Sequence, residues 1–464
     1  MTQIAENHMQ SLRSRVTGTV AGPGSADYRD AVNIWNGAID RHPSLVVRCA
    51  SSADVAQALG FAQERGLEVS VRGGGHNFAG FAVTEGGLMI DLTPLKSVQV
   101  DPGARTVTAG GGVTWAELDA AGQQHALAVP GGFISHTGIG GLTLGGGMGW
   151  LTRLGGLSCD NLTGAEVVTA DGRILRASEE EHPDLFWALR GGGGNFGVVT
   201  EFKYRMHQVG PVVNLAIFFA GMGQGAALLR YARGLFNKLP RDLTMFVAGL
   251  NFPPEPFVPA EQQGQPGWAL VVVGYGSAQA HERAVAPVRA AVSPLFELVT
   301  PIPYVNLQQM FDGSAPWGIM GYERGIFLEE LTDGAIDTIV GNQPHKQAAL
   351  TFTPIFCLGG AFADTPEDAT AFGGSRSMRY VVNMAAISAS KDEYEHDRQW
   401  ARDCWSALVP HAGGVASYVN FMSEYEEDRV KASYGPAKYQ RLAQLKREYD
   451  PTNVFHLNAN IRPA

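Results

Sequence analysis

The chain has 464 residues, of which 45% are hydrophobic and 17% charged, and its formal net charge is −10. This length exceeds what one ordinary core accommodates, so it predicts two or three domains, and the composition excludes a disordered chain. A duplex-binding protein needs clustered lysine and arginine to displace phosphate counterions, and no basic run is present. We therefore expect a folded protein that binds no nucleic acid.

The four cysteines, Cys49, Cys159, Cys357 and Cys404, are widely spaced and form no CxxC or Cys/His cluster. We therefore expect no metal site. The N-terminal segment lacks the apolar core of a signal peptide, and no uncharged apolar stretch approaches the roughly 18 residues of a membrane span. These features favour a cytoplasmic protein with reduced thiols that is not bound to membranes, as a monomer or homodimer.

Residues 45–72 predict a strand, a helix and a second strand. Ser52 can cap the helix and Gly66 can end it, and so short a strand–helix–strand unit implies a βαβ crossover. The loop GGGHNFAG at 73–80 follows the second strand, where a phosphate-binding loop would lie.

Short strands are expected over 87–110, followed by a helix over 114–126 and a stretch with nine glycines at 131–149. Residues 165–177 predict a hairpin that turns at Asp171-Gly172, because Asp-Gly favours the tight turns that join antiparallel strands. A short helix over 183–190 and a strand over 196–206 complete this part of the chain.

Glycine becomes sparse beyond residue 210, and strands alternate with helices until about residue 412. This pattern predicts an α+β fold whose second part, 211–412, is an antiparallel sheet with helices on one face. The first part comprises residues 1–210. Residues 413–464 form a third segment that contains a helix, a turn at Asp450-Pro451 and an extended tail.

Fifteen of the 58 glycines lie in three dense runs, 71–75, 138–149 and 191–197. A dinucleotide pyrophosphate needs backbone N–H donors at close range, and side chains would block that approach. Neither the Rossmann pattern GxGxxG nor the P-loop pattern GxxxxGK[ST] is present. Single runs also serve turns and bulges, but three in succession after a βαβ unit predict a dinucleotide of another binding class.

Four motifs resemble those of the berberine-bridge-enzyme-like oxidases in the vanillyl-alcohol-oxidase superfamily, with wording nearest to bacterial members of the 6-hydroxy-D-nicotine-oxidase type. They are RGGGHNFAG at 72–80, GIGGLTLGGGMGWLTRLGGLSCDNL at 138–162, DLFWALRGGGGNFGVVTEF at 184–202 and YDPTNVFHLNANI at 449–461. The resemblance covers nearly the whole chain. It implies a two-subdomain FAD-binding domain from residues 1–210, to which 413–464 return, and a substrate domain at 211–412 whose sheet covers the isoalloxazine.

The resemblance also implies that His76 is bonded covalently to the flavin 8α-methyl. Many relatives carry a second bond through a cysteine, but Ile134 occupies that position here and cannot form a thioether. We therefore expect one covalent bond, with Cys159 an ordinary buried thiol. The other expected cofactor-binding residues are Arg72, Gly73, Gly74, Gly75, Asn77, Gly80, Gly138, Gly140, Gly141, Gly145, Gly146, Asp160, Gly197, Val198, Asn458 and Asn460.

Catalytic groups are less well defined by the resemblance. Tyr418 and Asn420 are candidates on an expected strand, SYVNF, although Tyr418 would need help to act as a base because an ordinary tyrosine has a pKa near 10. It could equally be a packed residue with a satisfied hydroxyl. Asn383 is a third candidate, on the strand RYVVNMAAIS. Residues of lesser weight are Arg379 on the same face, Tyr380 on the other, His136 in the glycine stretch, and the aromatic residues Trp317, Tyr322, Phe352 and Phe356.

Leu142 stands where many relatives have a histidine beside the flavin, so another group must stabilise the reduced ring. The resemblance implies hydride removal from an alcohol or amine C–H of a small molecule such as a sugar, alkaloid or secondary metabolite, with O2 as acceptor and H2O2 as product. A dehydrogenase with another acceptor and a flavin-binding protein without turnover remain as alternatives.

Overall fold

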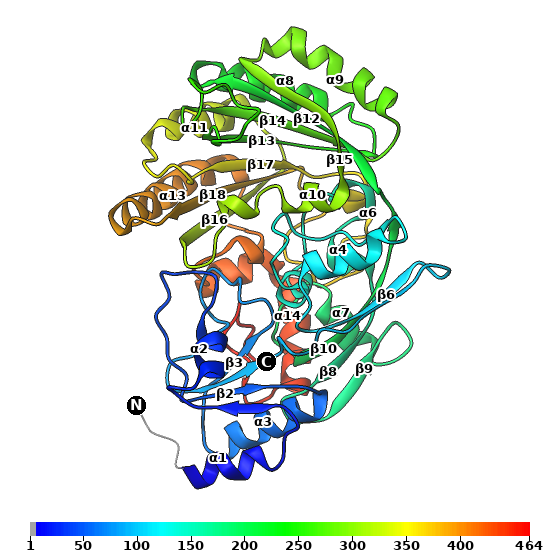
Figure 1. Ribbon diagram of the computed structural model, residues 1–464, viewed down its shortest axis with the longest axis vertical. Coiled ribbons are helices and arrows are strands. Elements are labelled where there is room, and N and C mark those ends of the chain that lie inside the picture. Colours follow the sequence, from blue (N-terminus) through cyan, green and yellow to red (C-terminus); the bar gives the residue numbers. More distant parts are fainter. Residues whose placement is uncertain (1–5) are drawn as a thin grey trace.

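The computed structural model describes residues 6–464, and the expected βαβ unit is present at the base of the molecule (Figure 1). Strands β2 and β3 both pair in parallel with β4, and β1 closes the other edge in the order β1-β2-β4-β3. Ser51, not Ser52, caps the helix, because its side chain accepts the Asp54 N–H. The bounds are α1 Glu6–Arg13, β1 Thr19–Ala21, α2 Ala26–Val32, β2 Leu45–Arg48, α3 Ser52–Glu64, β3 Val69–Arg72 and β4 Leu88–Asp91.

A second sheet of five antiparallel strands stands beside the first, in the order β5-β6-β10-β8-β9. The expected hairpin at Asp171-Gly172 is confirmed as the β8–β9 connection, and the short helix after it is α7. The bounds are β5 Val98–Asp101, β6 Thr106–Gly110, α4 Trp115–Gln123, β7 Leu127–Ala128, α5 Ile139–Leu144, α6 Thr152–Gly155, η1 Ser158–Asn161, β8 Leu162–Val168, β9 Ile174–Ala177, α7 Pro183–Leu189, β10 Val198–Arg205 and β11 His207–Gln208.

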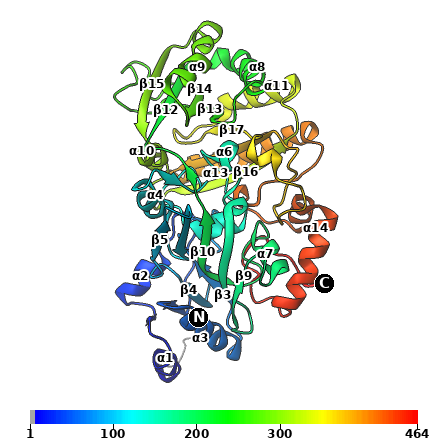
Figure 2. The ribbon, with the colours of Figure 1, turned by 90° about the vertical axis from the view of Figure 1, so that its right-hand side faces the viewer.

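Seven antiparallel strands form the upper sheet, in the order β15-β12-β14-β13-β17-β18-β16. Helices α8, α9, α11 and α13 pack on one face of it, as expected, and share a core with alternate strand residues (Figures 1 and 2). The bounds are β12 Val212–Gly221, η2 Met222–Gln224, α8 Gly225–Phe236, β13 Leu243–Asn251, β14 Pro266–Gly274, α9 Ala278–Val292, β15 Phe296–Pro303, α10 Tyr304–Gln309, η3 Asp312–Ser314, β16 Met320–Leu328, α11 Asp333–Asn342, η4 Gln343–His345, β17 Thr353–Cys357, α12 Ala361–Asp364, β18 Tyr380–Ser388 and α13 Lys391–Ala412.

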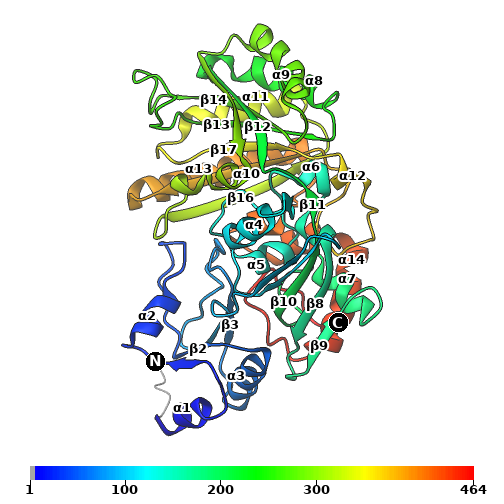
Figure 3. The ribbon, with the colours of Figure 1, turned by 45° about the vertical axis from the view of Figure 1, so that its right-hand side comes forward.

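The opposite face of the upper sheet packs against the glycine-rich part of the chain. Ile217, Phe246 and Val381 on this face share a core with Trp150 and Tyr418. Figure 3 shows the segment with α4 and α5 between the upper sheet and the lower sheets. The residues that alternate with the helix-facing ones therefore look towards the glycine stretch, and this interface is where a site between the two tiers must lie.

The segment SYVNF is not a strand, so this expectation was wrong. Val419–Phe421 form the 3-10 helix η5, because Tyr418 and Asn420 bond to the glycine stretch instead of pairing with a sheet edge. Helix α14 (Glu427–Tyr449) then runs down the lower tier, kinked at Gly435, which has φ 70° (Figure 2). In the tail beyond it, Phe455 packs into the core around β2 and β4.

Lys446 near the end of α14 holds this tail in place. Its buried Nζ donates to the carbonyl oxygens of Asn195 and Phe455, both at 2.8 Å, and to the Asp450 carboxylate at 2.6 Å. Both charged side chains are fully buried, so all three hydrogen bonds act without competition from water. No helix within residues 6–464 is long and apolar enough to cross a membrane.

We expect Lys446→Met to lower the free energy of unfolding by about 3–5 kcal/mol, because the change leaves the Asp450 carboxylate buried without its cation. Chemical denaturation of the purified variant measures this. The matched control is Lys431→Met, which removes an exposed pair with Glu427 and should change the free energy of unfolding far less than Lys446→Met does. Equal losses in the two variants would contradict this role of Lys446.

Candidate cofactor and active site

His76 lies in the loop after β3, and aromatic rings hold its imidazole on several sides. Trp35 stacks on it with ring centroids 5.3 Å apart, and Trp317 approaches edge-on at 5.6 Å. His76 Nε2 lies 2.6 Å from His136 Nδ1. Burial, followed by the charges of His136 and Arg72, lowers the pKa of His76 well below its ordinary value, so the ring is a neutral imidazole.

The hydrogen-bond partners define which His76 nitrogen is free. In a pair of neutral imidazoles one of the two facing nitrogens donates and the other accepts. His76 Nε2 is therefore occupied by the contact with His136, and Nδ1 is the ring nitrogen that lies outside this pair. Since the neighbouring rings fix the imidazole, Nδ1 has one direction in which to react.

The first two glycine runs touch each other through bare backbone beside His76. A Cβ on Gly74 would lie 2.1 Å from the Gly138 nitrogen, and one on Gly138 would lie 2.3 Å from the Gly74 nitrogen. Gly141, one turn further on, is exposed although Ile139 and Gly140 before it are buried, and a Cβ there would meet no atom within 4 Å. The two loops therefore border accessible space with main chain, as binding of a pyrophosphate requires.

The third glycine run meets the C-terminal tail. Asn195 donates to the carbonyls of Gly192 and Ala459 and accepts the Ile461 N–H, so loop and tail form one unit. The Oδ1 atoms of Asn458 and Asn460 are buried without a hydrogen-bond partner. Two unpartnered acceptors beside a glycine loop fit a dinucleotide that supplies N–H or O–H groups.

Other predicted cofactor residues have partners within the protein. Most of the remaining glycines are needed because a Cβ would collide with a neighbouring side chain: Gly80 with Ile39, Gly145 with Asn420, Gly146 with Phe372 and Gly197 with Val167. A Cβ on Gly140 would come close to Phe202, and one on Gly75 would come close to Arg72. Arg72 donates to the carbonyls of Asp30 and Ala31, and Asp160 pairs with Arg376 at 2.7 Å. Val198 pairs with Val168 in the lower sheet. For these residues, contacts within the protein are sufficient to explain why this residue type occurs at each position.

The Tyr418 hydroxyl is committed to the glycine stretch. It accepts from the N–H groups of Gly147 at 2.7 Å and Met148 at 3.2 Å, and from the Asn420 side chain at 2.8 Å. Asn420 also donates to the Leu142 carbonyl. Burial raises the pKa of Tyr418 in spite of these donors. The two residues therefore hold residues 142–148 in position, and the structure gives the tyrosine no free approach to a substrate.

Asn383 lies on the face of β18 that looks away from the helices. Its Nδ2 donates to Glu323 Oε2 on β16 at 2.9 Å. Sequence reasoning missed Glu323, whose only signal is that Glu323 and Arg324 are consecutive charges in a strand and must face opposite sides. Burial raises the pKa of Glu323 to about 8.

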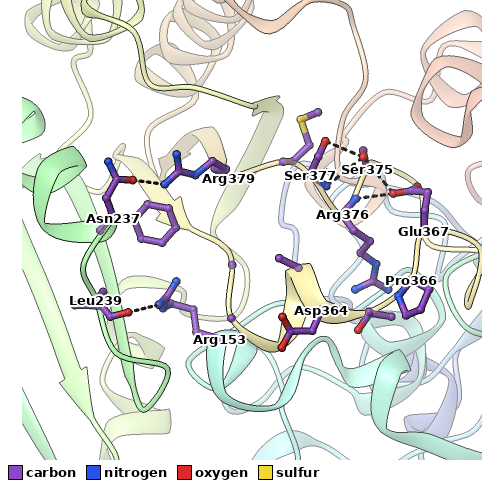
Figure 4. Close-up of a pocket in the computed structure, with 16 residues that line it drawn as sticks. Arg153, Asn237, Leu239, Asp364, Pro366, Glu367, Ser375, Arg376, Ser377 and Arg379 are labelled. Atoms are coloured by element: carbon purple, nitrogen blue, oxygen red, sulfur yellow. Dashed lines mark hydrogen bonds between the residues drawn. The ribbon is translucent and has the colours of Figure 1, made fainter.

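The remaining candidates divide between the two faces of the upper sheet. Tyr322 and Tyr380 pack in the helix-side core, while Phe356 lies in the core on the opposite face and Phe352 packs beside Trp35. Arg379 lies just before β18, at a surface pocket of about 850 Å³ (Figure 4). Arg153 in this pocket donates to the carbonyls of Leu239, Leu243 and Leu358, so its charge is already used by the protein. Among residues 6–464, no three His, Cys, Asp or Glu side chains could together hold a metal ion.

Comparison with known proteins agrees with this geometry. Residues 43–178 match the family described as "FAD binding domain", and residues 417–462 match "Berberine and berberine like". The chain is 30% identical to an FAD-linked oxidoreductase of Dictyostelium discoideum, over 100% of this chain and 97% of that one, and 31% identical to (R)-6-hydroxynicotine oxidase of Paenarthrobacter nicotinovorans, over 97% of each. The crystal structure of 6-hydroxy-D-nicotine oxidase from Arthrobacter nicotinovorans superposes with a TM-score of 0.85 at 29% identity, covering 97% of this chain and 98% of that one.

The fold and the glycine-lined site thus define an FAD-linked oxidoreductase. The chain belongs to the berberine-bridge-enzyme-like family, as the motifs indicated.

We expect Gly138→Ala to lose most of its bound flavin, because the new Cβ would collide with the Gly74 backbone and separate the two loops. The ratio of visible flavin absorbance to protein absorbance in purified protein measures this. Gly60→Ala is the control, since Gly60 lies within α3 with open space around it. Full flavin content in Gly138→Ala would show that the close contact of the loops is not required.

Proposed function

We propose that this protein removes hydride from the C–H bond beside the nitrogen or oxygen of a small organic amine or alcohol, with FAD bonded covalently to His76. The observation that supports this most directly is the His76 imidazole, neutral and fixed by Trp35 and His136, at the edge of the contact between the glycine loops. The face of the upper sheet with Asn383 lies opposite. When bound, FAD would supply the hydride acceptor at its N5.

We infer that Nδ1 of His76 makes the bond to the flavin, because Nε2 is occupied by the 2.6 Å contact with His136 Nδ1. The backbone of Gly73, Gly74 and Gly138 would receive the pyrophosphate, with Asn458 and Asn460 as acceptors near it. Tyr418 and Asn420 are positioning residues in this proposal, since they hold the glycine stretch.

A single covalent bond is proposed, without a cysteinyl link. Ile134 is aliphatic and packs in the small cluster around Trp35. The Cys159 thiol is buried, and burial with the neighbouring Asp160 raises its pKa well above the ordinary value. A thiol held protonated in this way is a poor nucleophile.

O2 is the proposed electron acceptor, with H2O2 as product, and the oxidase name of the relative at 31% identity supports it. Peroxide release during turnover separates this proposal from a dehydrogenase. All four cysteines are buried and unpaired, which supports a reducing compartment such as the cytoplasm. One chain contains every residue invoked, so either a monomer or a homodimer would serve.

We expect His76→Ala to lose the yellow colour that stays with acid-precipitated wild-type protein, because no other group in this proposal bonds the flavin. Digestion of wild-type protein should yield one flavin peptide, and it should contain His76. The control is His42→Ala, a histidine on the surface. Acid-stable colour in His76→Ala, or a flavin peptide containing Cys159, would disprove the assignment.

The catalytic proposal is tested with an anaerobic screen of amines, N-heterocycles, oligosaccharides and phenolic alcohols. A substrate should bleach the visible flavin absorbance, and readmitted O2 should restore it with one H2O2 for each flavin. Protein that retains its flavin but is bleached by no compound in any class would support a binding role without turnover.

A further inference from the structure

We propose that Glu323 and Asn383 form the recognition site for the basic nitrogen of the substrate, which makes the substrate an amine. This rests on the proposed oxidation and deepens it, because the reaction class alone leaves amines and alcohols open. Glu323 would contact the substrate directly, and Asn383 would position its carboxyl and share the contact.

The position of Glu323 on β16 directs it towards the His76 loop. Gly321, two residues earlier on the same face, meets the Trp35 ring, and Gly325, two residues later, meets Phe421. Alternate residues of a strand lie about 7 Å apart, so Glu323 falls between these two contacts. Since Trp35 stacks on His76, the carboxyl faces the same region as the proposed flavin bond.

A second chain of contacts leads from the histidine loop to the same carboxyl. Asn77, the neighbour of His76, donates to the Tyr425 hydroxyl at 3.1 Å, and Tyr425 stacks on Phe81. Ser423, two residues before Tyr425, accepts the Glu323 backbone N–H at 2.8 Å and donates its own N–H to the Glu323 carbonyl at 3.2 Å, which brings this segment beside Glu323. Glu323 is thus approached from β3's loop and from residues 423–425.

The Glu323 carboxyl has no compensating cation in the part of the chain described. Glu323 is only 4% exposed. Its Oε2 accepts a hydrogen bond only from the Asn383 amide, and its Oε1 has no hydrogen-bond partner. Arg324 faces the other side of the strand, where it pairs with Glu424 and Glu426. Burying an unpaired carboxyl is costly, so a structural reason for Glu323 is lacking.

The free atoms at this position select for a donor-rich ligand. Glu323 Oε1 and Asn383 Oδ1 are both buried and unpartnered, and both are acceptors once Glu323 is ionised. An ammonium group offers N–H donors to both and the positive charge that the carboxylate lacks, whereas an alcohol offers one neutral O–H.

The carboxyl is also suited to hold a proton. With the site empty, burial keeps Glu323 protonated near neutral pH, since its pKa is raised to about 8. A bound ammonium supplies the countercharge that ionises it, and the carboxyl proton is released to solvent. Transfer of one N–H proton to Oε1 then breaks that N–H bond, forms an O–H bond and leaves the nitrogen lone pair free, as oxidation of an amine requires.

The test uses the flavin-loaded enzyme and two probes of equal shape, N-methylbenzylamine and benzyl methyl ether, titrated anaerobically by calorimetry. Wild-type protein should bind the amine about 10- to 100-fold more tightly than the ether, as expected for a charge-assisted hydrogen bond. Glu323→Gln should lose this preference and bind both probes alike. Asn383→Ala should weaken amine binding less than Glu323→Gln does.

The matched control is Asp119→Asn. Asp119 is another buried carboxyl, on α4, whose pKa burial raises to about 7 and whose partner is Gln308 at 2.8 Å. Both amide variants should fold, with a melting temperature at pH 8 at least as high as that of wild-type protein. Each variant removes a carboxyl whose pKa is higher in the folded state than in the unfolded state. Such a carboxyl makes wild-type protein less stable as the pH rises to the folded-state pKa. Only Glu323→Gln should lose the preference for the amine.

This assignment is overturned if Glu323→Gln still prefers the amine. It is also overturned if wild-type protein shows no preference for the amine, which includes the case in which neither probe binds. The same samples are precipitated with acid to read the flavin bond independently. Coloured wild-type protein without an amine preference refutes only the role of Glu323. Colourless precipitate refutes the proposed flavin bond instead.

Discussion

The contact between Gly74 and Gly138 joins two loops that are more than sixty residues apart in the chain, and neither position tolerates a side chain. This contact places the turn after β3 against the start of α5. His76 and His136 lie just outside it on either loop, and so come within hydrogen-bonding distance. The orientation of the imidazole, the identity of its free nitrogen and the exposure of Gly141 all depend on the two main chains meeting without a Cβ between them.

The upper sheet completes the site because one of its faces packs against the glycine-rich tier, whereas helices α8, α9, α11 and α13 cover the other face. Strand alternation sends Tyr322, Arg324 and Ile326 towards α13, and Gly321, Glu323 and Gly325 towards the glycine-rich tier. The glycines flanking Glu323 permit Trp35 and Phe421 to approach the strand. Segment 422–429 is fastened to the same strand by ion pairs from Arg324 to Glu424 and Glu426, which hold Tyr425 over the loop that carries His76. The ion pairs on the helix side of β16 thus stabilise the position of Tyr425 on the other side of the strand.

The parts that sequence could predict are those governed by neighbours in the chain. Periodicity and turn residues predict the βαβ unit, the Asp171-Gly172 hairpin and the helix-covered sheet. The glycine runs predict that the chain binds a dinucleotide. SYVNF failed because Asn420 bonds to the Leu142 carbonyl 278 residues away, and no local pattern encodes that. Trp35 and Glu323 were missed for the same reason. Their roles depend on contacts with His76 and Asn383, which are distant in sequence and are brought together only by the fold.

Lys446 and Glu323 show two ways in which this fold treats a buried charge. Lys446 has an opposite charge and two carbonyl acceptors, so its donors are fully used and the group acts as a structural clamp. Glu323 has one amide donor and an oxygen without a partner, and the adjacent Arg324 points to the opposite face of the strand. Folds satisfy buried polar groups where stability alone decides. A half-satisfied carboxyl facing the proposed flavin-bearing histidine therefore indicates a group kept for a ligand, with the stability of the empty site reduced in consequence.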